Sequence, residues 1–362
     1  MPMADVRGVA LVGPGQLEEI RLPLPALGDD DALLRVDGCG VCGVDVALHD
    51  GRGPAQRLPV VLGHEVVGTI TAIGPLAAGR WDVRVGDRVV VEEAIPCRRC
   101  RRCSGGRGRL CRERPRYGHT PPDVTPGLWG GYAEALYLHP DAVVHRADEA
   151  LPVDLATLFV PVANGIAWLS EAASLRPGDS VVVLGPGQHG LACVAAARRL
   201  GAGPVVVAGL PADRERLAAA EALGATATTS DTQRLAALVD RVTDGHGADV
   251  VIDITPGAGD PIRTAVELAA VGGCIVLAGS KDGAVDGFPA NEVFRKELTL
   301  RGVYARHSSA VEVALRWLAD DPDAFAPLRG PTFSLSQLDT ALAVAAGRTG
   351  SRPPHVTVVP QT

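Results

Sequence analysis

Features typical of membrane, secreted and repetitive proteins are missing from this chain of 362 residues. Its longest apolar runs, such as 180–184, are far shorter than the roughly 20 residues that cross a bilayer. We recognise no secretory leader, internal repeat, low-complexity tract or flexible linker. We therefore expect a cytoplasmic protein without a membrane-spanning segment.

Lysine is also scarce, since Lys281 and Lys296 are the only two in the chain. Positive charge is carried by arginine instead, and nine arginines crowd residues 97–116 beside one acid, Glu113. We interpret this stretch as a solvated loop, with a subunit contact or an anionic partner as the alternative. The arginines are Arg98, Arg99, Arg101, Arg102, Arg107, Arg109, Arg112, Arg114 and Arg116.

Length and composition describe a soluble protein of more than one domain. Hydrophobic residues make up 46% and charged residues 21% of the chain, and its length exceeds that at which a single core stops growing. A net charge of −7 argues against a general nucleic-acid binder. We therefore expect two domains and a small-molecule substrate.

Eight cysteines are present, and most of them fall in two tight clusters. One cluster has the spacing C-x2-C-x2-C-x7-C, which can close four thiolates around one tetrahedral zinc ion. A disulfide framework fits poorly, because no secretory leader precedes the clusters. The sequence thus predicts a structural zinc site formed by Cys97, Cys100, Cys103 and Cys111.

The pattern of the chain changes near residue 153. Before it, glycine and proline alternate with short β-branched runs such as 60–62, 66–73 and 88–91, which predicts an irregular β-rich domain. A helical pattern follows, and strands then alternate with helices up to about 278, as in βαβ units on a parallel sheet. Beyond residue 300 we expect a helix at 309–319 and a last strand at 355–359 that returns to the first domain.

A glycine-rich turn lies inside this alternation. The predicted strand 180–184 runs into Gly185-Pro-Gly187-Gln-His-Gly190 and then a helix of small residues. Gly185 permits a tight turn, Gly187 lets the backbone approach a pyrophosphate, and Gly190 allows the helix to pack closely on the strand. The motif predicts a dinucleotide site that also includes Gln188 and His189.

The residue at the end of the next strand helps to select between NAD and NADP, because it would lie near the adenosine ribose. An acid there would accept hydrogen bonds from the ribose of NAD and repel a 2′-phosphate, but Gly209 occupies the position. Arg214 and Arg216 follow within reach, which favours NADP. Asp213 turned toward the ribose would instead favour NAD, so we expect NAD(P) with a preference for NADP.

Together these motifs resemble the medium-chain dehydrogenase/reductase superfamily, in its zinc-containing alcohol and polyol dehydrogenase branch. The resemblance spans nearly the whole chain. Besides the two motifs above, it rests on Gly40-Val-Cys42-Gly-Val-Asp45, Leu62-Gly63-His64-Glu65, Gly86-Asp87-Arg88-Val89 and Arg295-Lys296-Glu297-Leu298. It implies that Cys42, His64 and Glu65 hold a catalytic zinc while Asp45 orients His64. We expect the remaining cysteines, Cys39, Cys193 and Cys274, to pack in the core.

The resemblance also implies an α/β architecture. A GroES-like catalytic domain would span 1–154 and 300–362, and a Rossmann domain with a doubly wound parallel sheet would span 155–299. The active site would lie between the two domains. The assembly would be a homodimer or homotetramer, often built by extending the Rossmann sheets across a two-fold axis.

Three positions depart from the pattern of that family. Val44 replaces the Ser or Thr that begins a proton relay, and Ala47 replaces a histidine that often supports it. Val160 stands where a further Cys or acidic ligand is common. General acid–base assistance is worth about 10²–10⁴ in rate, so this loss matters, although His49 or Asp50 is a candidate substitute.

The leading hypothesis is a zinc-dependent NAD(P)-linked oxidoreductase that interconverts a secondary alcohol and its ketone. An alternative is an NADPH-dependent reductase of an activated C=C or C=N bond, which the missing relay would suit. A third is a cofactor-binding protein without turnover whose arginine-rich loop meets an anionic partner or RNA; steep salt-dependent retention on heparin would support it.

Overall fold

A computed structural model describes residues 5–53, 56–257 and 259–361. The chain divides into two compact units. Unit 1 comprises residues 1–160, 307–322 and 329–362, and unit 2 comprises 161–306 and 323–328. The observed boundaries thus fall several residues beyond the expected ones at 154 and 299.

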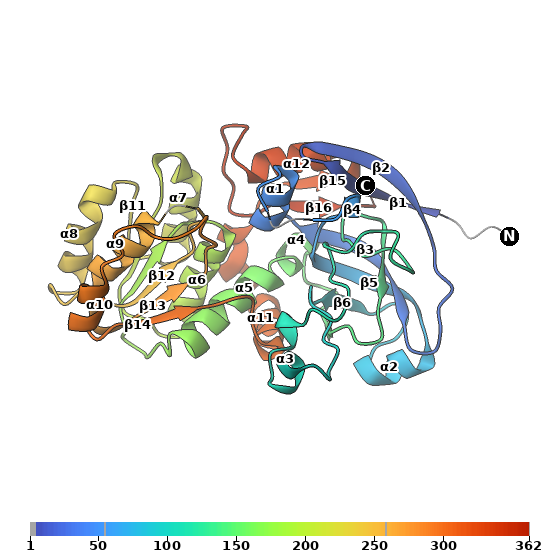
Figure 1. Ribbon diagram of the computed structural model, residues 1–362, viewed down its shortest axis with the longest axis horizontal. Coiled ribbons are helices and arrows are strands. Elements are labelled where there is room, and N and C mark those ends of the chain that lie inside the picture. Colours follow the sequence, from blue (N-terminus) through green and yellow to red (C-terminus); the bar gives the residue numbers. More distant parts are fainter. Residues whose placement is uncertain (1–4, 54–55, 258, 362) are drawn as a thin grey trace. The chain divides into compact units, whose positions relative to one another are not determined.

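Unit 1 is built on two sheets. A three-stranded sheet has the order β2-β1-β4, and a seven-stranded sheet has the order β15-β16-β3-β5-β6-β8 with β7 pairing β3 (Figure 1). The strands of unit 1 are β1 (Asp5–Gly13), β2 (Gln16–Pro23), β3 (Ala32–Gly40), β4 (Val60–Val61), β5 (Glu65–Ile73), β6 (Arg88–Val91), β7 (Ala135–Leu138), β8 (Val144–Arg146), β15 (Thr332–Ser334) and β16 (Thr357–Val359).

Short helices connect these strands. The helices are α1 (Gly43–His49), α2 (Pro75–Trp81), α3 (Arg101–Ser104), α4 (Val153–Ala156), α11 (Ser308–Asp320) and α12 (Leu338–Ala345), with 3-10 turns η1 (Gly108–Leu110) and η5 (Leu335–Gln337). β3, β5 and β6 lie in the middle of the larger sheet, and their inward side chains join those of β1 and β7 in one apolar core.

The C-terminal strand returns to unit 1, as the sequence predicts. β16 pairs antiparallel with β3, and Val358 lies opposite Cys39. Both residues are fully buried. The pairing places the end of the chain beside the turn that carries Cys42, because Val41 donates its N–H to the carbonyl of Val356 at 2.9 Å.

Unit 2 contains one parallel sheet with the order β11-β10-β9-β12-β13-β14 (Figure 1). This is the doubly wound order. Successive strands are added on one side of β9 up to β11 and then on the other side from β12, with all strands parallel. β9 and β10 are continuous buried runs of valine ending in Leu184 and Ala208, as expected of central strands covered on both faces.

Helices α6, α7, α8 and α9 pack against this sheet. The elements of unit 2 are η2 (Trp168–Ala172), β9 (Val181–Leu184), α6 (Gln188–Arg199), β10 (Val205–Ala208), η3 (Pro211–Asp213), α7 (Arg214–Ala222), β11 (Ala227–Thr229), α8 (Thr232–Val242), β12 (Ala248–Asp253), α9 (Asp260–Leu268), β13 (Ala269–Leu277), α10 (Ala290–Arg295) and β14 (Thr299–Gly302).

Two segments of the chain connect the two units in ways that the sequence did not indicate. The first boundary falls inside α5 (Phe159–Ala167), which begins in unit 1 and continues into unit 2. The turn η4 (Pro322–Leu328) brings residues 323–328 back to unit 2, where Phe325 is buried and the Arg199 guanidinium lies 5.4 Å from its ring centroid. One buried aromatic ring therefore assigns this segment to unit 2.

One helical run has the length and hydropathy of a membrane span. It covers Val153–Ala172 with a mean hydropathy of 1.4, and 83% of the apolar window is buried inside the protein. Core helices of soluble proteins pass the same test of length and composition.

Candidate metal and cofactor sites

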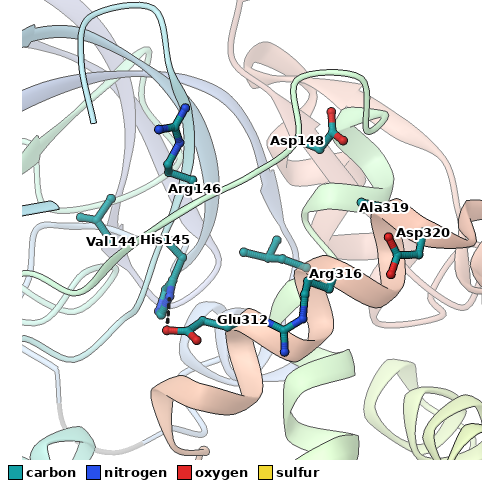
Figure 2. Close-up of a pocket in the computed structure, with 9 residues that line it drawn as sticks. Val144, His145, Arg146, Asp148, Glu312, Arg316, Ala319 and Asp320 are labelled. Carbon is teal, nitrogen blue, oxygen red and sulfur yellow. Dashed lines mark ion pairs between the residues drawn. The ribbon is translucent and has the colours of Figure 1, made fainter. Parts of the chain in front are cut away.

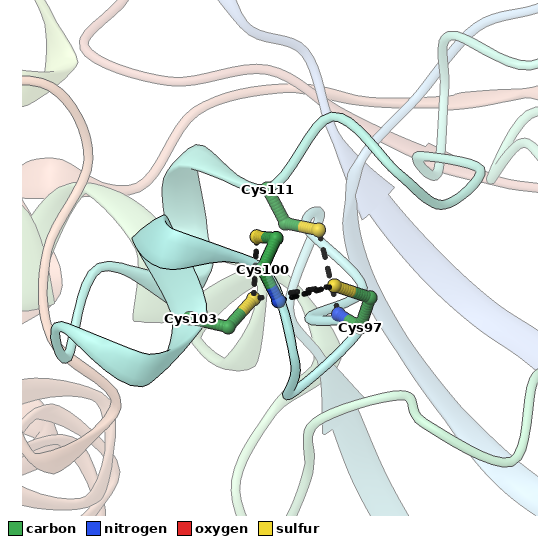
Figure 3. A group of neighbouring side chains, drawn as sticks. All are labelled: Cys97, Cys100, Cys103 and Cys111. Atoms are coloured by element: carbon green, nitrogen blue, oxygen red, sulfur yellow. Dashed lines mark hydrogen bonds between the residues drawn. The ribbon is translucent and has the colours of Figure 1, made fainter.

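The four cysteines of the predicted zinc motif converge in unit 1, around α3 and η1 (Figure 3). Their sulfur atoms all lie within 4.8 Å of one another, with 3.9 Å between Cys97 and Cys103 and 3.5 Å between Cys100 and Cys103. Four thiolates at about 2.3 Å from one zinc ion are about 3.8 Å apart, so the cluster already has nearly the required dimensions. None of the four is in a disulfide.

Backbone N–H groups donate to two of these sulfurs. The N–H of Cys100 donates to Cys97 Sγ at 3.3 Å, and the N–H of Cys97 donates to Cys111 Sγ at 3.4 Å. Backbone hydrogen bonding, led by the N–H of Arg99, lowers the pKa of the Cys97 thiol to about 6. The donor set therefore fits a closed structural zinc site.

Acids outside the arginine-rich stretch pair with some of its members. Asp141 lies 2.8 Å from Arg114 and 3.6 Å from Arg98, and Glu93 pairs with Arg116. Other arginines of the stretch are exposed: Arg99, Arg101, Arg102, Arg107 and Arg112.

A second donor cluster forms where two segments of unit 1 meet. Cys42 caps the N-terminus of α1, His64 precedes β5, and Glu65 is the first residue of β5. All three are buried, and one ligand atom from each lies within 4.8 Å of the others. Gly40 provides the space for Glu65, because a Cβ atom there would come within 2.4 Å of Glu65 Oε2.

Asp45 lies behind this cluster, where the sequence places it. Its carboxylate is fully buried, accepts the N–H of Cys42 at 2.9 Å, and lies 3.6 Å from His64 Nδ1. Burial opposes ionisation of both groups, but their mutual attraction wins: the pKa of Asp45 is lowered and that of His64 is raised well above its ordinary value. Since Nδ1 faces Asp45, Nε2 is the nitrogen available to a metal.

The donor set of Cys42, His64 and Glu65 fits a zinc ion. Burial, followed by the nearby Glu65 carboxylate, raises the pKa of the Cys42 thiol. A divalent cation among the three groups would reverse that penalty and favour the thiolate. Thiolate, imidazole and carboxylate are common zinc ligands, and three of them leave a position open for substrate.

The structure shows where the three residues that depart from the family pattern lie. Val44 is exposed on α1, and Ala47 is half-buried on the same helix. Val160 is buried in α5, and within the described residues the second donor cluster contains only three ligating side chains.

The proposed substitutes for the missing relay are engaged elsewhere. His49 Nδ1 lies 3.4 Å from Asp50, and His49 Nε2 lies 3.7 Å from Asp339 of α12. Asp50 also pairs with Arg52 and Arg348. These contacts join α1 to the C-terminal part of unit 1, which is a structural role.

Three further residues near the donor cluster escaped sequence reasoning. The ring of His119 stacks on that of His64, with the centroids 5.7 Å apart, and His119 Nε2 lies 3.2 Å from Glu93. The Tyr132 hydroxyl donates to Asp45 Oδ2 at 3.1 Å. Nothing in the local sequence indicates these contacts, because each joins segments that are distant along the chain.

In unit 2 the glycine motif forms the turn between β9 and α6. Gly185 adopts a φ of +99°, which glycine tolerates best. A Cβ atom at Gly190 would come within 2.0 Å of the Gly185 carbonyl oxygen, whereas a Cβ atom at Gly187 would meet nothing within 4 Å. Gly187 caps α6, so the positive N-terminal end of the helix dipole borders this open space.

The other predicted residues of the dinucleotide site flank this turn. Gln188 begins α6, and the ring of His189 stacks on that of Trp168 with the centroids 5.5 Å apart. Gly209, after β10, packs against the turn, since a Cβ atom there would lie 2.8 Å from Pro186 Cγ. A larger side chain at this position would displace the glycine turn.

Asp213 does not point freely toward a ribose site. Its Oδ2 accepts the N–H of Leu210 at 2.9 Å, and its Oδ1 lies 3.7 Å from Arg216. Arg214 is exposed at the start of α7. The Asp213 carboxylate, which would favour NAD, is therefore held in a turn. The guanidinium of the next residue, Arg214, is exposed.

A separate hollow of about 490 Å³ lies elsewhere in unit 1 (Figure 2). It is lined by basic and acidic side chains of β8, the following loop and α11. His145 is bonded there to Glu92 at 2.9 Å and lies 4.0 Å from Glu312. The hollow shares no lining residue with the two donor clusters.

Two family models match the chain in sequence. One is described as an alcohol dehydrogenase GroES-like domain and matches residues 28–148, and the other is described as a zinc-binding dehydrogenase and matches residues 190–320. The first covers both donor clusters. The second begins at Gly190, in the first turn of α6.

Individual proteins are similar over most or all of the chain. A probable alcohol dehydrogenase of Mycobacterium tuberculosis is 42% identical over 366 residues, covering 99% of each chain. A probable D-xylulose reductase A of Arthroderma otae is 33% identical over 302 residues, covering 81% of each. The crystal structure of a putative zinc-binding dehydrogenase from Sinorhizobium meliloti, bound to NADP, has a TM-score of 0.83 at 25% identity and covers 99% of this chain and 100% of that one.

These matches agree with the fold of each unit and with the chemistry of the donor clusters. They confirm the expected GroES-like and Rossmann architecture and an oxidoreductase that uses zinc and a nicotinamide cofactor. The chain belongs to the medium-chain dehydrogenase/reductase superfamily, in its zinc-containing alcohol and polyol dehydrogenase branch.

Proposed function

We propose that this enzyme exchanges hydride between a nicotinamide cofactor and a polyhydroxylated secondary alcohol or the corresponding ketone. The observation that carries the proposal is the buried cluster of Cys42, His64 and Glu65, which is a zinc donor set with one open position. Similarity to a probable D-xylulose reductase, whose name denotes a ketose, supports the class of substrate.

The residues of the site would hold the metal, orient a ligand or bind the cofactor. Cys42, His64 and Glu65 would hold the metal, and Asp45 fixes the orientation of the His64 ring. When bound, zinc supplies Lewis-acid polarisation of a substrate oxygen, and the nicotinamide supplies the hydride chemistry. Gly187 and the N-terminus of α6 would receive the cofactor's pyrophosphate.

Zinc stoichiometry tests the metal part of the proposal. Native mass spectrometry of the purified protein should find two zinc ions per chain, and Cys42→Ala should retain one. A Cys274→Ala control should retain both, because Cys274 lies in β13 of unit 2, outside both donor clusters. One zinc ion in all three proteins would contradict an occupied first site.

Steady-state assays test the reaction. With NADPH or NADH, the enzyme should reduce ketoses and simple ketones and leave enones and imines unreacted. The exposed Val44, which lacks the hydroxyl of a relay, favours the second candidate, a reductase of C=C or C=N bonds. Preferential turnover of enones or imines would replace the first proposal with the second.

We infer a preference for NADP from the surroundings of Gly209. The position has no acid to repel a 2′-phosphate, Asp213 is bonded to Leu210 and faces Arg216, and Arg214 is exposed. A related zinc-binding dehydrogenase has been crystallised with NADP.

The preference is testable by fluorescence titration with NADPH and NADH. Arg214→Ala should weaken NADPH binding by about tenfold or more while leaving NADH binding unchanged, since a charge-assisted phosphate contact is lost. Arg234→Ala is a matched control, because Arg234 is an exposed arginine of α8 that pairs with Asp231. Tighter binding of NADH than of NADPH by the unmodified enzyme would contradict the preference.

We also propose a homodimer formed through β14 of unit 2. β14 ends the six-stranded sheet and pairs with β13 on one side, so its other edge offers backbone groups to a second copy. Near its amino end, Phe294 is 81% exposed and Val271 is 75% exposed. The N–H of Gly272 donates to the carbonyl of Lys296 at 2.7 Å, which brings these two segments together.

Light scattering during size-exclusion chromatography tests the dimer. The unmodified protein should elute at twice the chain mass or a multiple of it, and Phe294→Glu should shift it toward the monomer. Leu76→Glu is the matched control, because Leu76 is 58% exposed on α2 of unit 1. An unmodified protein that elutes as a monomer would exclude this assembly.

A further inference from the structure

Asp45 connects more groups than the family resemblance implies. Its Oδ2 accepts the N–H of Cys42 at 2.9 Å, and its Oδ1 accepts the N–H of Gly63 at 3.3 Å and faces His64 Nδ1 at 3.6 Å. The carboxylate therefore links the turn that carries Cys42 to the segment that carries His64. A change in its rotamer would move Oδ1 away from His64 Nδ1.

The fourth partner of Asp45 is a phenol hydroxyl. Tyr132 is fully buried, and its hydroxyl donates to Asp45 Oδ2 at 3.1 Å across 87 residues of sequence. Unlike the two backbone N–H groups, this donor belongs to a side chain that a single substitution can remove. Within the described residues, it is also the only side-chain hydroxyl that donates a hydrogen bond to Asp45.

The backbone holds Tyr132 firmly in this place. Its N–H donates to the carbonyl of Leu62 at 3.1 Å, and the N–H of Gly131 donates to the carbonyl of Gly63 at 2.8 Å. At Gly130 a Cβ atom would come within 2.0 Å of the Val61 carbonyl oxygen, so only glycine allows this approach. The segment before β7 is thus fixed against the residues that lead into His64.

We propose that Tyr132 is a positioning residue for the first zinc site, acting through Asp45 to fix the His64 ring. This inference rests on the proposed metal site of Cys42, His64 and Glu65. Without the hydroxyl, Asp45 Oδ2 retains one donor, and the buried carboxylate can rotate away from His64. Partners that orient a ligating histidine contribute about 10- to 100-fold to metal affinity.

The chain offers a matched control in Tyr137. This residue is also buried in unit 1, and its hydroxyl donates to the carboxylate of Asp31 at 3.0 Å. Tyr137→Phe and Tyr132→Phe therefore each remove one bond from a buried tyrosine to a carboxylate. Only Tyr132 contacts the group that faces His64.

Zinc affinity of the first site is the decisive readout, measured by competition with a chromophoric chelator. Tyr132→Phe should weaken the first site by about 10- to 100-fold and leave the zinc of the four-cysteine site in place. Tyr137→Phe should change neither. Equal affinities for Tyr132→Phe and the unmodified protein would overturn the inference, as would equal losses in both variants.

A double-mutant cycle separates a positioning role from general destabilisation. If Tyr132 acts through Asp45, Tyr132→Phe should have no further effect on zinc affinity in an Asp45→Asn background. Independent, additive effects would overturn the inference. An unmodified protein that binds only one zinc ion would overturn the proposed metal site as well, whereas two zinc ions and an unaffected Tyr132→Phe variant would overturn the role of Tyr132 alone.

Discussion

Two glycines at the start of α6, the capping Gly187 and Gly190 of the first turn, should respond differently to the same substitution. At Gly190 an added Cβ atom would lie 2.0 Å from the Gly185 carbonyl oxygen and 3.3 Å from Val183 Cγ1. At Gly187 it would enter open space. Alanine at Gly190 should therefore damage the fold, and alanine at Gly187 should damage cofactor binding.

The magnitudes follow from the contacts. The Gly185 oxygen belongs to backbone that is constrained by a φ of +99°, so Gly190→Ala forces the helix away from the strand. Overpacking of this kind costs about 3 kcal/mol of the free energy of unfolding, or more. Gly187 has a φ of −68°, which alanine adopts without strain. Alanine at position 187 restricts the unfolded chain more than glycine does, which stabilises the folded protein by about 0.4–1 kcal/mol. This stabilisation roughly offsets the poorer helix cap that alanine provides.

Urea unfolding and titration with NADPH separate the two effects. Gly187→Ala should unfold within about 0.5 kcal/mol of the unmodified protein yet bind NADPH at least about tenfold more weakly, because a methyl group would occupy the space that we propose for the pyrophosphate. Unchanged NADPH affinity in a folded Gly187→Ala protein would refute the placement of the pyrophosphate. A Gly190→Ala protein of unchanged stability would refute the packing argument.

Three further predictions concern the stability of each unit. Cys100→Ser should lower the zinc content by one ion and lower the unfolding midpoint of unit 1, measured by native mass spectrometry and calorimetry, because structural zinc contributes directly to folding. Lys296→Met should destabilise unit 2 by about 1.5–3 kcal/mol in urea unfolding, because the ammonium donates to three carbonyls at and just beyond the end of α9, at 2.7–3.0 Å. Burial lowers the pKa of His355 to about 4, so the folded state favours the neutral ring. Stability should fall as the pH drops from about 6.5 to about 4, by at most about 1.4 kcal/mol per pH unit, and His355→Gln should flatten that dependence in urea unfolding.

The sequence predicted elements well where a single pattern decides the structure. β6 was expected at 88–91 and has those bounds, and β9 was expected at 180–184 and spans 181–184. Both are short β-branched runs that are buried on the sheet, so hydrophobicity alone defines them. The donor residues could be predicted equally well, because zinc ligands are of a few residue types at restricted spacings.

The elements that escaped prediction have weak local signals. β2 is mostly exposed, and β11 has only three residues, none fully buried. Such strands are defined by their partners: β2 follows β1 through an antiparallel pairing, and β11 lies beside β10. The contact between Tyr132 and Asp45 is likewise a consequence of tertiary structure, since 87 residues separate them. No periodicity or spacing can encode it.

The two donor clusters differ in the charge that they would give to a bound zinc ion. A zinc ion held by four thiolates carries a net double negative charge and has no open position, so it can bind no substrate. The nearby arginines, including the exposed Arg101 and Arg102 of α3, offset that charge. One thiolate, one carboxylate and a neutral imidazole would instead leave a bound zinc ion formally neutral and would let it act as a Lewis acid on a substrate oxygen. Mutual attraction with Asp45 keeps the His64 ring oriented without adding a ligand. Replacement of His64 by cysteine should therefore bind zinc and still impair polarisation of a substrate oxygen, which ketone reduction measured beside zinc stoichiometry would detect; full activity of His64→Cys would contradict this account of the ligand set.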